Sequence, residues 1–99
     1  MKALERALNK IEGYLMSIKR DVVEGHYYLE VGIPKNWVYK ETDTVACEVL
    51  QETKQGDFVK IYPLKDGIVI DDLIGFVNII IDTNKLIAKK QEEFDKQLE

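Results

Sequence analysis

Few side chains in this sequence are of the types that catalyse reactions or bind metals. It contains one histidine, His26, and one cysteine, Cys47. A metal site or a Cys-His nucleophile pair needs several such groups at defined spacings, and neither residue has a second His or Cys nearby. Cys47 lies in a stretch predicted to be a strand, where a small buried apolar role is usual. We therefore expect no enzyme activity, no metal and no cofactor.

Asp71 and Asp72 are adjacent carboxylates, a pairing that serves acid-base chemistry or magnesium binding in other proteins. They come immediately before a long segment with periodic apolar residues. At that place carboxylates accept the free N–H groups of a helix start and interact favourably with the helix dipole. The pair therefore predicts the beginning of a helix.

The chemistry that the sequence does offer is recognition, by aromatic and basic side chains between residues 27 and 40. Rings on a sheet stack on unpaired bases while nearby lysines contact phosphates, which fits single-stranded nucleic acid. Exposed rings also anchor protein partners. The alternative is that these rings seal the sheet against the helices. The candidate partner-binding residues are Tyr28, Lys35, Trp37, Tyr39 and Lys40.

Size and charge limit the class of protein. The 99 residues fit one small domain spanning residues 1–99. A domain this small gains stability from a partner that covers apolar area, so we look for oligomerisation. Basic residues number 14 and acidic residues 18, for a net charge of -4, which argues against a whole surface devoted to nucleic acid. A local basic patch is still compatible with this balance.

The sequence also bears on the compartment. A lone cysteine forms no internal disulfide, which favours a reducing environment. The first residues have mixed charge and no apolar run, unlike a secretory signal. The apolar stretch at residues 73–81 is far shorter than the roughly 20 residues that a membrane span needs. We expect a soluble, cytoplasmic protein without membrane contact.

Apolar residues recur every three or four positions along residues 1–24, which predicts a long N-terminal helix. The steps form a heptad seam of the kind that joins helices in coiled coils. The alternative is that the same stripe packs on this chain's own sheet or C-terminal helix. The oligomer-interface residues predicted on this helix are Leu8, Ile11, Leu15 and Ile18.

Residues 26–70 alternate apolar and polar side chains between turn signals, which predicts an antiparallel sheet of three to five short strands. Pro34 ends the first strand because it cannot donate to the ladder. Further strands are expected at residues 37–40, 44–52, 58–62 and 68–70.

Residues 71–99 predict a second long helix, whose later part narrows to a heptad stripe with coiled-coil character. Asn84 falls at an a position, where two facing Asn side chains fix the register of a parallel dimer. Replacing Asn84 with Leu is then expected to raise the melting temperature. The alternative is a helix that leaves the domain and frays. The oligomer-interface residues predicted here are Ile80, Asn84, Ile87, Gln91 and Phe94.

The stretch from His26 to Tyr39, which contains Ile-Pro-Lys-Asn-Trp, followed by short strands and a Lys/Glu-rich helix, resembles small accessory proteins encoded by bacteriophages and prophages. The resemblance implies a context, such as a virion component or an inhibitor of a host defence, and transfers no functional residue. Together the patterns predict an α+β fold and a non-enzymatic, homo-oligomeric module, with a dimer favoured, that binds a host or viral protein. The alternatives are a single-stranded nucleic-acid-binding accessory protein and a virion structural component.

Overall fold

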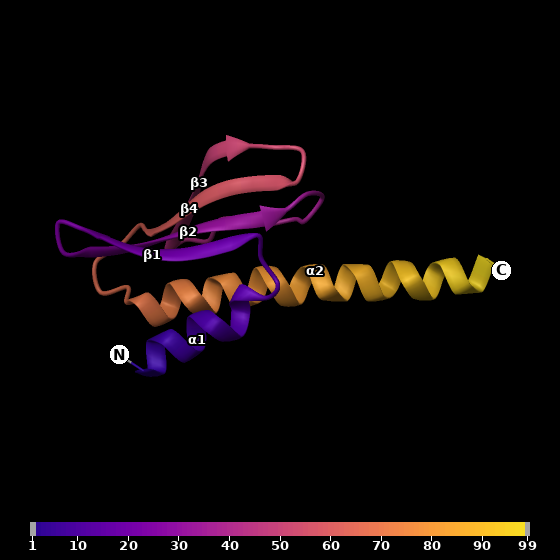
Figure 1. The fold of residues 1–99 in the computed structure, drawn as a ribbon, viewed down its shortest axis with the longest axis horizontal. Helices are drawn as coiled ribbons and strands as arrows, with labels where there is room; N and C mark the ends of the chain where they lie inside the picture. Colours follow the sequence, from indigo (N-terminus) through magenta and orange to yellow (C-terminus); the bar gives the residue numbers. More distant parts are fainter. Residues whose placement is uncertain (1, 99) are drawn as a thin grey trace.

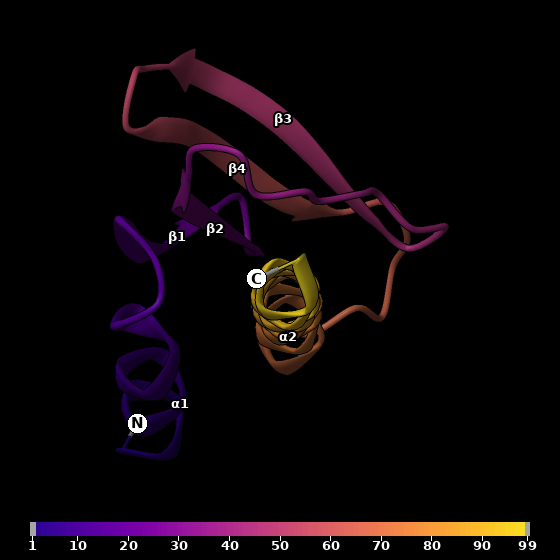
Figure 2. The same cartoon turned by 90° about the vertical axis from the view of Figure 1, so that its right-hand side faces the viewer.

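The computed structural model describes residues 2–98, which form two α-helices and one four-stranded antiparallel sheet (Figure 1). The predicted α+β class is confirmed. Both helices lie on one face of the sheet, which we call the core face, and the other is the outer face (Figures 1 and 2). The elements in chain order are α1 (Lys2–Glu12), β1 (Ser17–Val23), β2 (His26–Pro34), β3 (Val45–Glu52), β4 (Gly56–Pro63) and α2 (Ile70–Leu98).

The strand order β1-β2-β4-β3 is built from two hairpins. The β1–β2 hairpin turns at Glu24 and Gly25, whose φ angles of 53° and 81° suit a tight two-residue turn. In the β3–β4 hairpin, the Thr53 hydroxyl oxygen accepts the Gly56 N–H at 3.2 Å. Residues 35–44, which we call the crossing segment, carry the chain from β2 to the far edge of the sheet.

The core lies between the two central strands and α2. Alternate residues of these strands face the helices and are almost fully buried, because a strand directs successive side chains to opposite faces. The strand residues are Leu29, Val31, Ile33, Val59 and Ile61. The α2 side chains buried in the same cluster are Ile70, Leu73, Ile74, Phe76, Val77, Ile80 and Ile81.

The expected helix over residues 1–24 is wrong beyond Glu12. Residues 17–23 form β1, which pairs along its whole length with β2. The heptad spacing of Ile18 and Val22 also fits a strand, because both fall on alternate positions and are β-branched. The Glu24-Gly25 turn then favours the hairpin over a continued helix.

The N-terminal interface residues accordingly lie on three different elements and pack inside the chain. Leu8 and Ile11 are on α1, Leu15 is in the turn after it, and Ile18 is on β1. Ile11 is buried in the core, and the other three are partly buried against it. This is the alternative in which the stripe packs on the chain's own sheet and helix.

The expected strands over residues 44–52 and 58–62 are confirmed as β3 and β4. The strands expected over residues 37–40 and 68–70 are wrong. Residues 37–40 belong to the crossing segment and have no strand partner within the described chain. Residues 68–69 lead directly into α2, which begins at Ile70. Asp71 and Asp72 lie in the first turn of α2 and not before it, and there the Asp72 carboxylate accepts the Val69 N–H at 2.9 Å.

The second helix is longer than the sheet on which it packs. Its side chains are buried at intervals as far as Asn84, whereas residues 85–97 are exposed on every side. This part, which we call the projecting half of α2, extends past the sheet (Figure 1) and gives the molecule a long axis of 55 Å against 28 and 24 Å.

Candidate functional site

One side chain, Asn84, holds the crossing segment against α2. Its Oδ1 atom accepts the Val38 N–H at 2.8 Å, and its Nδ2 group donates to the Val38 carbonyl oxygen at 2.7 Å. Nδ2 also donates to the Ile80 carbonyl oxygen at 2.8 Å. Asn84 therefore satisfies its amide entirely within the chain, in a buried position.

The predicted place of Asn84 in a seam between two copies is therefore wrong, and so is that of Ile80, which is buried in the core. A heptad position shows that a side chain faces a neighbour without showing which neighbour it is. Here the neighbour is the backbone of the crossing segment. Ile87, Gln91 and Phe94, the other three predicted interface residues of this helix, lie on the projecting half and are exposed.

The five candidate partner-binding residues do not form one surface. Trp37 and Tyr39 are half-buried and pack against the core from the crossing segment. Tyr28 lies on the outer face, where the Lys60 Nζ atom sits 4.4 Å from the centre of its ring. Lys35 is exposed in the turn after β2, and Lys40 is exposed further along the crossing segment. The rings therefore form no common stacking platform.

Two titratable groups, Tyr39 on the crossing segment and Cys47 on β3, are held in their neutral forms. The Tyr39 hydroxyl donates to the Asp57 Oδ2 atom at 3.0 Å, and burial together with this bond raises the pKa of Tyr39 to about 12. Burial, with a smaller effect of Glu41, raises the pKa of the Cys47 thiol to about 11. A thiol with this pKa is protonated at neutral pH and is a poor nucleophile, as expected for a structural cysteine.

The outer face carries a feature that the sequence analysis did not find, a row of alternating charges across all four strands. Lys19 pairs with Glu30, Glu30 with Lys60, and Lys60 with Glu48 in the strand register. The Lys19 Nζ atom lies 2.7 Å from the Glu30 carboxylate, whose hydrogen bond and charge raise the pKa of Lys19. The alternation of residues 58–62 predicts that Lys60 lies on one face of its strand. The row is recognised only when the pairing register of all four strands is known.

Beside Lys60 the outer face also carries aromatic side chains. Lys60 lies over the rings of both Tyr28 and Tyr62, at 4.4 and 5.7 Å from their centres. Phe58 follows the same alternation on β4, and all these side chains are half-buried. This face offers rings and mutually compensated charges, a composition that suits a protein surface better than a polyanion.

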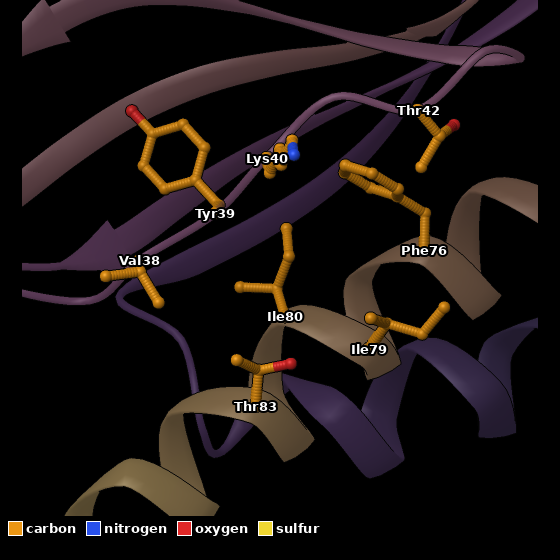
Figure 3. A pocket seen from close by; sticks show the side chains of 8 residues that line it. All are labelled: Val38, Tyr39, Lys40, Thr42, Phe76, Ile79, Ile80 and Thr83. Atoms are coloured by element: carbon orange, nitrogen blue, oxygen red, sulfur yellow. The ribbon is translucent and has the colours of Figure 1, made fainter.

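An apolar cavity of about 330 Å³ opens between the crossing segment and α2 (Figure 3). Phe76 and Ile80 extend from the helix toward the crossing segment, Ile79 lies beside them along the helix, and Lys40 is the charged residue of the lining. The remaining lining residues are Val38, Tyr39, Thr42 and Thr83.

The same face of α2 continues into the projecting half. Phe94 follows Thr83 by eleven residues, a spacing that returns a helix to about the same angular position after about three turns. Ile87, Lys90 and Phe94 line a second, shallower hollow along this face. Large apolar side chains are exposed along the helix: Ile79 is 63% exposed, Leu86 53%, Ile87 38% and Phe94 59%. This face of α2, from Phe76 to Phe94, is the candidate functional site.

Residues 2–98 contain neither a candidate metal site nor a candidate membrane-spanning helix. No group of three or more His, Cys, Asp and Glu side chains in this range is placed to hold a metal ion. None of the described helices is both long and apolar enough to cross a membrane. Comparisons of the chain with protein-family models, with curated proteins and with solved structures found no match.

Proposed function

We propose that the chain is a non-enzymatic interaction module that self-associates through the projecting half of α2. One observation carries this proposal: residues 85–97 form a regular helix past the edge of the sheet, with Leu86, Ile87 and Phe94 exposed. Function then resides in assembly, with the sheet free to contact a second protein.

The projecting half of α2 would be more stable if a second helix packed against it. The projecting half continues a helix that the packed half of α2 already nucleates, so it forms by propagation, which adds little free energy per residue in water. It lies outside the core of its own chain, so no side-chain packing within the chain stabilises it further. Burying one Leu, Ile or Phe side chain contributes roughly 1.5 to 3 kcal/mol. A partner helix therefore stabilises this segment.

We further propose that the outer face binds a host or viral protein, following the resemblance to small phage accessory proteins. Its rings and paired charges, around Tyr28, Lys60 and Tyr62, are the supporting observation. Capture from a host lysate tests this: a protein retained by the wild type and lost with Lys60→Glu supports it. Retention of the same protein by both contradicts it. The residues first considered for nucleic acid lie on separate surfaces, so nucleic acid is not proposed as the ligand.

Self-association is tested by the mass in solution, measured by sedimentation equilibrium over a range of micromolar concentrations. We expect the wild type to exceed the 11.5 kDa of one chain and to dissociate on dilution. Phe94→Asp is expected to give the single-chain mass, because a carboxylate in the interface would be desolvated without a partner.

Leu50→Asp is the matched control, since Leu50 is 48% exposed but lies on β3, away from α2. It is expected to leave the mass unchanged. A wild type that has the mass of one chain at every concentration would contradict the proposal. Circular dichroism of both variants confirms that they are folded.

A further inference from the structure

We infer that two copies pair their α2 helices antiparallel, so that Phe94 of each copy enters the cavity between the crossing segment and α2 of the other. This rests on the proposed self-association and specifies its geometry. The occupant of the cavity is then a second copy of this chain.

The surface is complementary to itself, as a two-fold dimer requires. It carries an exposed ring, Phe94, and an apolar cavity that reaches to Thr83, on one face of one helix. The two residues are about 16 Å apart along the axis and about 20° apart around it. Antiparallel helices that cross near residues 88 and 89 bring each Phe94 level with Thr83 of the other copy. The same crossing places both Ile87 side chains near the two-fold axis.

The volume and the apolar lining of the cavity also suit the phenyl ring of Phe94. An apolar cavity of about 150 Å³ is large enough to hold a benzene ring, and the cavity here measures about 330 Å³. Its walls are largely apolar, formed by side chains such as Ile79, Ile80 and Phe76 (Figure 3). A phenyl ring that enters it exchanges contact with water for contact with these walls, which is favourable.

Charge distinguishes this arrangement from a parallel pair. Asp95 follows Phe94 directly, and Lys40 lines the cavity on the crossing segment. When Phe94 enters the cavity, Asp95 approaches Lys40 of the other copy, and the two charges attract. A parallel pair would instead set Phe94 beside Phe94, leave the cavity open and place Asp95 near Lys90 of the other copy.

The test is charge exchange in the full-length chain, with the dimer dissociation constant measured by sedimentation equilibrium at low salt. Asp95→Lys is expected to raise that constant roughly three- to tenfold, because an attraction becomes a repulsion. The double variant Asp95→Lys with Lys40→Asp is expected to restore it. The matched control, Asp95→Lys with Lys90→Asp, is expected not to restore it.

Restoration by Lys90→Asp instead of Lys40→Asp would overturn the antiparallel geometry while leaving self-association intact. An unchanged dissociation constant in Asp95→Lys would also overturn it. A wild type without any dimer would overturn both this inference and the proposed function, so the two failures are distinguishable. Phe94→Ala is expected to weaken the dimer by at least about tenfold, as for an aromatic anchor that fills a pocket of its partner, and an unweakened dimer would overturn the docking of the ring.

Discussion

The amide of Asn84 joins parts of the chain that lie 46 positions apart in the sequence. It pairs with both backbone groups of Val38, much as a neighbouring strand would, and thereby places Val38 and Lys40 at the cavity. The heptad stripe predicted that Asn84 faces Asn84 of a second copy, whereas the structure places it against the crossing segment of its own chain. The contribution of Asn84 to stability has the opposite sign to that expected for a dimer seam, because removing it leaves backbone groups without partners.

Asn84→Leu is therefore expected to lower the free energy of unfolding, by about 2 to 4 kcal/mol, since the Val38 N–H and carbonyl lose their partner. Urea denaturation followed by the fluorescence of Trp37, which packs against the core, measures the change. Asn78→Leu is the matched control, because Asn78 is exposed on the same helix; its effect is expected within about 0.5 kcal/mol. A more stable Asn84→Leu variant would restore the dimer-seam interpretation.

Cys47 and Tyr39 make the stability of the fold depend on pH in the alkaline range. The folded chain raises the pKa of Cys47 from 9.0 to about 11 and that of Tyr39 from 10.0 to about 12. Between pH 9 and 12 the folded state therefore holds protons that the unfolded state has released, so stability falls as pH rises. Below pH 9 both groups are protonated in the folded and the unfolded state, so they cause no loss of stability there. Denaturation midpoints at pH 8 and pH 11 are expected to show this fall.

Tyr39→Phe and Cys47→Ala separate the two groups. Cys47→Ala is expected to reduce the fall that begins near pH 9, and Tyr39→Phe the fall between pH 10 and 12. Equal pH dependence in the wild type and both variants would show that neither group is responsible. Comparison of each variant with itself at pH 8 removes the direct cost of the lost contacts.

At the scale of elements, periodicity identified α2 and the strands β2, β3 and β4 but extended the first helix too far. In residues 17–23 the apolar positions fit both a helix and a strand, and the decision depends on pairing with β2. Such pairing is a tertiary property that a local pattern does not contain. The cavity could not be predicted from the sequence for the same reason, because its two walls come from separate parts of the chain.

Two glycines are expected to respond oppositely to the same substitution. At Gly56, the start of β4, a Cβ atom would meet the Ile33 carbonyl oxygen of β2 and the Met16 sulfur. Gly56→Ala is therefore expected to destabilise the fold by about 1 to 3 kcal/mol, as an overpacked core does. At Gly75, within α2, the space around a Cβ atom is free. Gly75→Ala is expected to stabilise by roughly 0.5 to 1 kcal/mol, because alanine favours a helix.

Urea denaturation of both variants under one set of conditions gives the comparison. Gly75→Ala serves as the control for Gly56→Ala, since the two changes add the same methyl group. A loss of stability in Gly75→Ala comparable to that in Gly56→Ala would show that the approach of β4 to β2 is not the cause.

For the whole molecule, the fold divides into a packed part and a projecting part. The packed part includes both hairpins, α1, the crossing segment and α2 as far as Asn84. The projecting half adds length without adding buried side chains in its own chain. Fold stability and assembly are therefore expected to be separable by shortening α2.

A chain that ends at Ala88 tests this separation, because it keeps one turn beyond Asn84 and removes Phe94 and Asp95. It is expected to sediment as a single chain and to unfold cooperatively. In dilute solution, where the full chain is also dissociated, the two free energies of unfolding are expected to agree within about 1 kcal/mol, since the removed side chains were exposed. The far-ultraviolet helical signal should decrease by the share of the removed turns. If the shortened chain unfolds, the projecting half supports the fold of its own chain, and its exposed apolar side chains no longer argue for a partner.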